Sequence, residues 1–382
     1  MLSSLALDRA RIAELNSQIL AVQNSLVALK NELKSVQARL DAYRYPILTM
    51  PNEMVSHIFV YTLPPYPLCS PLWGHFSPNA LGQVCRKWRD IALSTPMLWR
   101  APSFVLSSLW SPRGLCLALE RGLKLFEAWL TRSGSCPLSI QLKDARSSAA
   151  LTHVSLNRFA EIIIRHLHHV EHIDLSASDK VDLSQLASVS AVSLMPLLRV
   201  LKLGSWSTED SFPVARFLNA PLLRSVHIIR LSSPSKLQLP WHQLTSLILE
   251  GVSARTSAAI LQKTVNLVDF RLRPSMQTTP IDSDLPGDMS ISLNHLESLE
   301  IERQWIAFLS SLTLPALQSL KITQCSAVAD LWSLDNLLFR WGCNLERLHV
   351  TSKGSSNYFG DSTRDSYRSK FPSIPTILVE QC

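Results

Sequence analysis

A short apolar pattern that recurs from residue 170 onward constrains the fold more than any other feature of the chain. Every copy has apolar residues at positions i, i+3 and i+5, as in "VEHIDLS" and "LQSLKIT". The copies begin at Val170, Leu198, Leu223, Leu244, Leu267, Leu296, Leu317 and Leu345. Successive copies are 28, 25, 21, 23, 29, 21 and 28 residues apart. Such a period indicates an array of similar structural units that stack against one another.

Leucine-rich repeats have this period and this arrangement of apolar residues. Each copy therefore predicts one short strand, followed by a helix or an irregular segment on the convex side. The Asn or Cys that follows the strand in regular repeats is largely missing, since position i+8 fits only at Cys325. We predict an α/β fold in which residues 105–382 form an irregular leucine-rich-repeat solenoid with a parallel β-sheet.

Segments on either side of the eight copies extend this array. An amphipathic helix is predicted from Ser111-Pro112 to Leu130, and the alternating residues from Pro137 predict a strand, so this pair is a first, degenerate unit. Residues 353–370 are polar and are predicted to be loose. A short apolar run follows them at residues 377–379.

The repeats also predict which side chains face outward on the concave side of the sheet. Side chains alternate along a strand, so positions i+2, i+4 and i+6 point away from the core. Parallel strands lie about 4.8 Å apart, so equivalent positions in neighbouring copies form rows. The row at i+4 reads Asp174, Lys202, His227, Ile248, Arg271, Glu300, Lys321 and His349. The row at i+6 includes Glu250, Arg273, Glu302 and Thr323.

These charged rows have two interpretations. Solenoids bind through their concave faces, so the centre of the rows is a candidate site for an unknown target protein. The alternative is a ladder in which Arg271, Glu300 and Lys321, or Arg273 and Glu302, neutralise one another, at under about 1 kcal/mol per exposed pair. The candidate target-binding residues are Lys202, His227, Arg271, Arg273, Glu300, Glu302 and Lys321.

A different periodicity marks residues 1–44. Apolar residues recur at alternating steps of 3 and 4, without proline or glycine, which is a heptad repeat. They are Ile12, Leu15, Ile19, Val22, Leu26, Leu29, Leu33, Val36 and Leu40. A helix over residues 8–43 would be about 54 Å long, and Pro46 disfavours its continuation. We predict a coiled-coil-like helix that self-associates through residues 8–43. Packing on a partner's helix or back onto the same chain are the alternatives.

Residues 45–104 predict a small all-α module. A first helix begins near Asn52, and its apolar face holds Met54, Val55, Ile58 and Phe59. A second helix begins at Ser77-Pro78, and its apolar positions are Leu81, Val84, Cys85, Trp88, Ile91 and Ala92. After a break at Thr95-Pro96 the chain returns with Met97-Leu98-Trp99. So small a unit leaves apolar surface uncovered, which marks a site for a partner.

This module resembles the F-box, in the form common in proteins of mushroom-forming fungi. The matching residues are Met50-Pro51, Glu53, Ile58-Phe59, Val84-Cys85-Arg86, Trp88-Arg89 and Pro96-x-Leu98-Trp99. The resemblance covers residues 1–104, and it departs from the usual pattern in a longer insert, residues 63–76. It implies that the module binds the Skp-type adaptor of cullin–RING ubiquitin ligases and, through this adaptor, a cullin.

The resemblance thus implies a substrate receptor of an SCF-type ubiquitin ligase, whose repeats hold a target while other subunits carry out the chemistry. The alternative is a non-catalytic scaffold that uses the module outside a ligase. For Val84 and Trp88, packing in the module's own core is an equal alternative to contact with the adaptor. The candidate adaptor-binding residues are Met50, Pro51, Ile58, Phe59, Val84, Cys85, Trp88, Leu98 and Trp99.

Charge and apolar patterning argue against other kinds of partner. The net charge of +7 arises before residue 147, without the dense Lys/Arg stripe and interleaved aromatics of a nucleic-acid site. No apolar run reaches the roughly 18 residues that a membrane span needs, and the start lacks the pattern of a signal peptide. Seven cysteines without a Cys-x-x-Cys pair suit a reducing compartment. We expect a cytoplasmic or nuclear protein that binds neither nucleic acid nor membrane.

The sequence contains little that predicts catalysis. Residues 166–172, "HLHHVEH", straddle a predicted junction of helix and strand, which would scatter the imidazoles of a zinc site. The chain has no glycine-rich phosphate loop and no Gly-x-Ser-x-Gly nucleophile elbow. We therefore expect no metal, no cofactor and no enzymatic activity.

Overall fold

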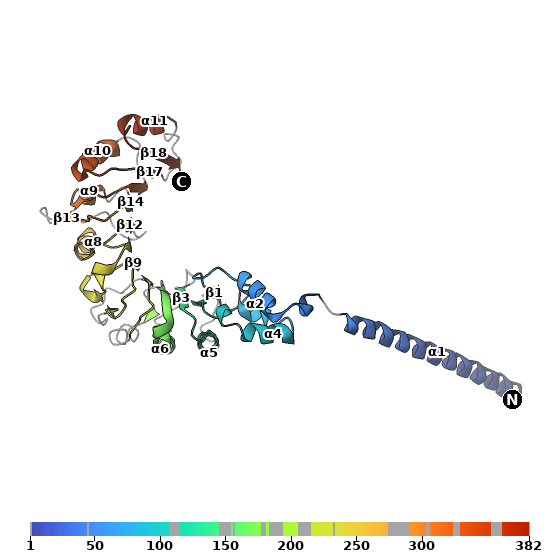
Figure 1. Ribbon diagram of the computed structural model, residues 1–382. Helices are drawn as coiled ribbons and strands as arrows, with labels where there is room; N and C mark the ends of the chain where they lie inside the picture. The colour runs from blue at the N-terminus through green and yellow to red at the C-terminus, as the bar shows by residue number, and fades with distance from the viewer. Residues whose placement is uncertain are drawn as a thin grey trace. The chain divides into compact units, whose positions relative to one another are not determined.

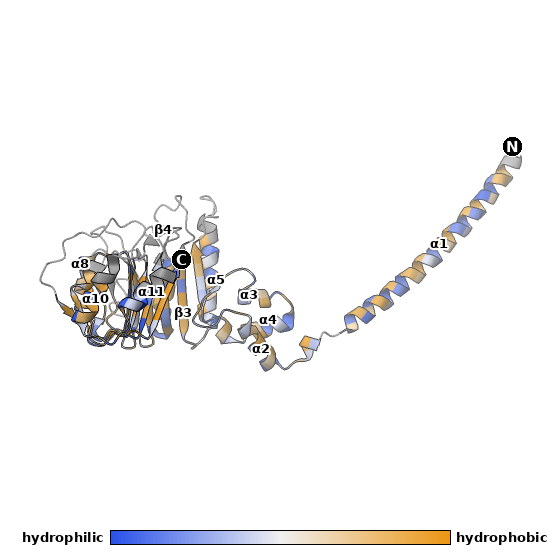
Figure 2. Ribbon diagram, turned by 90° about the horizontal axis from the view of Figure 1, so that it is seen from above, coloured by the Kyte–Doolittle hydropathy of each residue, from blue (hydrophilic) through white to orange (hydrophobic). Residues whose placement is uncertain are grey.

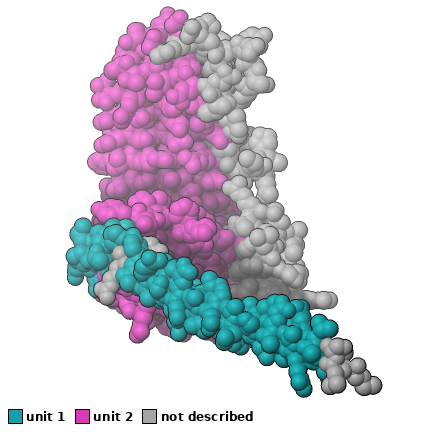
Figure 3. Space-filling model, turned by 90° about the vertical axis from the view of Figure 1, so that its right-hand side faces the viewer, with its two compact units in different colours: residues 1–58 teal, residues 59–382 magenta. Residues whose placement is uncertain are grey.

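The computed structural model divides the chain into two compact units, Met1–Ile58 and Phe59–Cys382 (Figure 3). The predicted helix start at Ser111-Pro112, Cys325 and residues 353–360 lie outside the residues that the structure describes. The described residues are 2–43, 46–106, 115–144, 154–155, 157–176, 181–182, 194–204, 215–231, 234–273, 290–302, 306–323, 329–352 and 361–381.

The first unit contains the predicted long helix, α1, which spans Leu2–Ala42. Polar and apolar residues alternate along it in Figure 2. All nine apolar heptad residues are exposed, from 40% at Leu15 to 67% at Val22. An isolated helix owes most of its stability in a protein to the packing of its apolar face. Within the first unit, therefore, no described residue covers the seam of α1. A short 3₁₀ helix, η1, follows at Pro46–Thr49.

The helix α2, Asn52–Tyr61, begins in the first unit and ends in the second. The prediction of a single helix from Ser77-Pro78 onward is wrong. Two helices form there: α3 over Pro78–Leu81 and α4 over Arg86–Leu93. The predicted start is confirmed, since the Ser77 side chain accepts a hydrogen bond from the Asn79 amide. The break occurs because Cys85 is extended and its Sγ caps α4 by accepting from the Trp88 amide at 3.5 Å.

Among the described residues, the second unit is built on one sheet of twelve strands, and every pair of neighbouring strands in it is parallel. The eight strands predicted from the repeats are all confirmed. They are β5 Val170–Leu175, β7 Val200–Leu203, β9 Ser225–Ile229, β11 Ser246–Glu250, β12 Asp269–Arg273, β14 Ser298–Glu302, β16 Ser319–Thr323 and β17 Arg347–Ser352. This parallel sheet with helices confirms the predicted α/β class.

Four further strands lengthen the sheet at its ends. The strand predicted from Pro137 is β3, Leu138–Asp144, and the apolar run near the end of the chain is β18, Thr376–Gln381. Two strands were not predicted: β1, Ser70–Pro71, and β2, Pro102–Leu106. The strand β1 belongs to the insert of residues 63–76. The sheet therefore begins inside the segment that departs from the F-box pattern.

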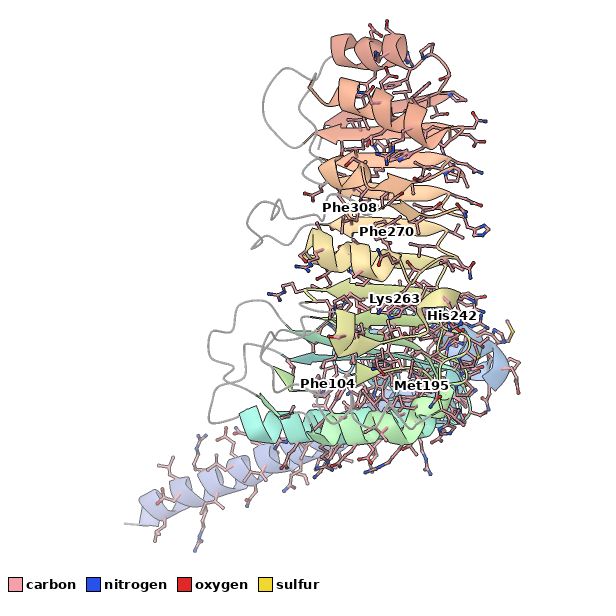
Figure 4. All side chains as sticks on the ribbon, turned by 90° about the vertical axis from the view of Figure 1, so that its left-hand side faces the viewer. Phe104, Met195, His242, Lys263, Phe270 and Phe308 are labelled. Atoms are coloured by element: carbon pink, nitrogen blue, oxygen red, sulfur yellow. The ribbon has the colours of Figure 1, made fainter. Side chains whose placement is uncertain are left out.

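Helices cover one side of this sheet. Figure 1 shows α8, α9 and α10 on the same side of the strands. The central strands alternate half-buried and buried side chains, as the repeat pattern predicted. The fully buried Phe104, Phe270 and Phe308 of this core are labelled in Figure 4. The solenoid helices that the structure describes are α5 Leu115–Arg132, α6 Asn157–His166, α8 Ala254–Leu261, α9 Ile306–Leu309, α10 Ala329–Trp341 and α11 Asp361–Lys370.

The prediction that residues 353–370 are loose is wrong for the second half of this segment. Residues Asp361–Lys370 form α11, which packs on β18. This polar segment forms a helix because its one central aromatic residue, Tyr367, is fully buried. Lys370 adds a salt bridge to Asp335 at 2.9 Å. Short elements complete the chain: η2 Pro96–Leu98, η3 Leu167–His169, η4 Pro234–Lys236, η5 Trp241–Gln243 and the strand pairs β4/β6, β8/β10 and β13/β15.

Candidate protein-interaction sites

Aromatic packing holds together the helical part of the second unit. The rings of Phe59 and Trp88 meet edge to face, 4.9 Å apart between their centres. Trp99 is buried, and its indole N–H donates to the Ala92 carbonyl at 2.8 Å. Its ring also meets Trp129 of α5 at 5.4 Å, edge to face. Trp99 therefore joins α4 to the first helix of the solenoid.

The predicted adaptor-binding residues divide by exposure. Phe59, Leu98 and Trp99 are buried and belong to the core. Pro51, Ile58 and Val84 are exposed, while Met50, Cys85 and Trp88 are half-buried. A direct contact with an adaptor stays a prediction for these six. Seven further apolar residues of this region are exposed but were not among the candidates: Met54, Tyr61, Leu68, Trp73, Phe76, Leu93 and Met97.

The insert of residues 63–76 is bound to the repeat strands. The Tyr66 hydroxyl donates to Glu171 Oε2 at 2.8 Å and lies 3.3 Å from His172 Nδ1 on β5. The Ser139 hydroxyl of β3 donates to the Pro67 carbonyl at 2.7 Å. The Ser70 amide donates to the Ala101 carbonyl at 2.8 Å, beside the pairing of β1 with β2. The insert thus connects α2 to the first strands of the sheet.

Burial sets the protonation of the groups around the insert. Burial raises the pKa of Tyr66 above its ordinary value, and the neighbouring Glu171 carboxylate raises it further, so the phenol stays protonated and donates. Burial also raises the pKa of the Cys69 thiol to about 11, which keeps it neutral and unreactive. Burial lowers the pKa of His172, so this imidazole is neutral at pH 7. The groups that join the insert to the sheet are therefore largely uncharged, apart from Glu171.

The concave rows form with the predicted register. At position i+4, Asp174 pairs with Lys202, Lys202 with His227, and the pairing continues strand by strand to His349. At position i+6, Glu250 pairs with Arg273, and Glu302 pairs with Thr323. The seven predicted target-binding residues therefore lie on one face of the sheet, on five of the six neighbouring strands from β7 to β16.

Three cations converge on one carboxylate at the centre of this face. Glu300 lies 3.7 Å from Arg271 Nε, 3.4 Å from Arg273 Nη2 and 3.6 Å from Lys321 Nζ. The side chain of Glu300 is only 17% exposed, whereas those of its partners are about 40% exposed. Arg271 also pairs with Asp269 at 3.3 Å. The predicted ladder of Arg271, Glu300 and Lys321 forms, and it leaves the cationic ends facing outward.

His227 contributes little positive charge to the i+4 row. Its Nε2 lies 3.5 Å from Glu250 Oε2, a contact that is too long for a good hydrogen bond. Burial lowers the pKa of this imidazole, and the nearby Lys202 ammonium lowers it further. The imidazole is therefore neutral at pH 7. The charge of the row resides in its lysines, arginines and carboxylates.

The histidines of residues 166–172 do not assemble a metal centre. The rings of His168 and His169 lie 3.9 Å apart, while His172 turns to Tyr66. Within the described ranges, no three His, Cys, Asp or Glu side chains gather where they could hold a metal ion. None of the helices that the structure describes combines the length and the apolar character needed to cross a bilayer.

A comparison with known families identifies a domain in the helical region before the repeats. Residues 47–105 match the F-box-like family. The match covers α2, α3, α4, the insert and most of β2, and it includes all nine candidate adaptor-binding residues. No curated protein is detectably similar to the chain. The chain therefore combines an F-box-like domain with a long parallel sheet of stacked repeats.

Proposed function

We propose that this chain is the substrate-recognition subunit of a cullin–RING ubiquitin ligase of the SCF type. Its F-box-like domain docks on the Skp-type adaptor, and through the adaptor on a cullin. The solenoid, of the divergent leucine-rich-repeat class, binds a target protein on its concave face. The single observation that carries this proposal is the F-box-like match at residues 47–105, followed directly by the parallel sheet.

The proposed activity is catalysis by proximity. Proteins with an F-box-like domain are typically non-catalytic adaptors, so the transfer of ubiquitin belongs to other subunits. The receptor raises the effective concentration of the target's lysines near the ubiquitin-carrying enzyme. The domains of this proposal are residues 1–44, 45–104 and 105–382, in a cytoplasmic or nuclear protein without a cofactor. The F-box-like domain belongs to the form common in mushroom-forming fungi.

The adaptor contact is tested by replacing both Met50 and Pro51 with alanine. Pro51 is exposed and Met50 is half-buried, so the change removes contact surface without opening a core cavity. We expect binding to a purified Skp-type adaptor to weaken at least about tenfold, as at an interface hot spot. The thermal unfolding midpoint should stay within a few degrees of that of the unchanged protein. Unchanged affinity of the double variant would remove Met50-Pro51 from the interface.

A scaffold that works outside a ligase is the second candidate function. The exposed heptad seam of α1 favours it, because a coiled coil can assemble proteins without any ubiquitin transfer. Under either function we propose that α1 pairs with a second copy of itself through residues 8–43.

Replacing Leu26 and Leu33 with glutamine tests this self-association. Both leucines are exposed, at 50% and 65%, so in a monomer the change costs little. In a coiled coil it places two amides per chain in the apolar seam. We expect light scattering to give a dimer or larger assembly for the unchanged protein and a monomer for the variant. A monomeric unchanged protein at tens of micromolar would exclude self-association at that concentration, and the circular dichroism of the sheet serves as the control for folding.

A further inference from the structure

A cavity lies between the end of α2, the insert and η2, and of the nine candidate adaptor-binding residues Leu98 alone lines it. Its volume is about 290 Å³, enough for one large apolar side chain. Its walls are mostly apolar and include Val60, Pro64 and Met97. At its rim Tyr61 is 85% exposed and Met97 is 47% exposed. Apolar surface of this kind, open to water, marks a place where another molecule binds.

A cation that has no counter-ion among the described residues also lines this cavity. The Arg100 guanidinium stacks on the Tyr66 ring, with its Cζ 4.1 Å from the ring centre. Among the residues that the structure describes, no carboxylate lies within salt-bridge distance of Arg100. The nearby Glu171 is already engaged by the Tyr66 hydroxyl at 2.8 Å and by Arg199 at 2.9 Å. Arg100 therefore presents unneutralised positive charge at the wall of an apolar cavity.

The wall that carries Arg100 is held in place before any ligand binds. Tyr66 is fixed by Glu171 and His172 of β5, and Pro67 is fixed by Ser139 of β3. The Arg100 carbonyl accepts from the Ser139 amide at 2.9 Å. A site whose walls are already ordered loses less entropy on binding, so even a short ligand can bind with useful affinity.

We propose that this cavity is a second protein-binding site, which takes a short segment of a partner in which a large apolar side chain is followed directly by Asp or Glu. The apolar side chain fills the cavity, and the carboxylate pairs with Arg100. Arginine binds carboxylates through two parallel hydrogen bonds, which fits a guanidinium whose face is already stacked on Tyr66. This inference goes beyond the proposed function, because the cavity needs no adaptor to bind such a segment.

Labelled peptides test the site on the intact chain without an adaptor. The probe is Gly-Ser-Phe-Asp-Gly-Ser with blocked ends, and its controls replace Asp with Asn or Phe with Gly. Fluorescence polarisation should show the Phe-Asp peptide binding at least about tenfold more tightly than the Phe-Asn peptide, as expected for a charge-assisted hydrogen bond. The Gly-Asp peptide should bind still more weakly, since it leaves the cavity empty. Equal affinity for the Asp and Asn peptides, or no binding at millimolar concentration, overturns the proposal.

Two variants assign the effect to Arg100. Arg100→Gln should bind the Asp and Asn peptides equally well. Arg132→Gln is the matched control, because Arg132 also stacks on an aromatic ring, that of Trp99 at 4.7 Å, and does not line this cavity. It should keep the preference for Asp. Should Arg100→Gln unfold, Met97→Glu replaces it, since a carboxylate at the rim neutralises Arg100 and should abolish binding of the Phe-Asp peptide. A retained preference for Asp in Arg100→Gln, or retained binding of the Phe-Asp peptide by Met97→Glu, rules the site out.

Discussion

Trp99→Ala is expected to lower the free energy of unfolding by about 3–5 kcal/mol, as is typical for truncation of a buried tryptophan. Trp99 is 1% exposed, donates to Ala92, packs on Trp129 and carries the Arg132 guanidinium on its face. Its loss opens a cavity between α4 and α5. Because these helices belong to one compact unit, adaptor binding should weaken together with stability.

Chemical denaturation with urea measures this loss. Phe339→Ala is the matched control, because Phe339 on α10 is 91% exposed. Its effect should stay within about 0.5 kcal/mol, as for most surface substitutions. If Trp99→Ala were no more destabilised than Phe339→Ala, the packing of α4 on α5 described here would be wrong.

Reversing both Arg271 and Arg273 to glutamate is expected to remove target capture while adaptor binding stays intact. The two guanidiniums supply two of the three cations around Glu300. The reversed charges place three carboxylates at the centre of the concave face, and like charge on an interface suppresses binding. Recovery of targets in a pull-down with quantitative mass spectrometry should fall at least about tenfold.

The matched control carries the same change of charge on the other side of the solenoid. Arg255 of α8 and Lys263 after it are exposed, and both change to glutamate. This control should recover the same targets as the unchanged protein. If the Arg271/Arg273 variant also recovers them at the same level, the charged row is only a ladder and the target binds elsewhere.

The repeat pattern predicted the sheet well because a strand in a stacked array is set by local residues. An apolar residue at i, i+3 and i+5 places the same three positions in the core of every copy, so the register of Arg271, Glu300 and Lys321 followed from the spacing alone. The heptad repeat predicted the helix α1 equally well. The periodicity does not show which surface the seam of α1 packs against.

Features that depend on distant contacts were not predictable. The helix after Ser77 divides at Cys85, where a thiol serves as the cap, a role usually taken by Ser, Thr, Asp or Asn. The helix α11 forms in a polar run because the side chain of Tyr367 is buried in the core. The strand β1 pairs with residues 32 positions later in the chain, and a two-residue strand has no periodicity to detect. The candidate cavity beside Arg100 arises from the same insert.

The most direct test of the account is reconstitution of the proposed ligase assembly. The intact chain is mixed with a purified Skp-type adaptor and a cullin, and the mixture is analysed by size-exclusion chromatography with light scattering. The account predicts co-elution of all three proteins in equal amounts per chain, and loss of co-elution for the Met50/Pro51 double alanine variant. Elution of the chain apart from the adaptor at micromolar concentration would contradict it and leave the scaffold as the function of this protein.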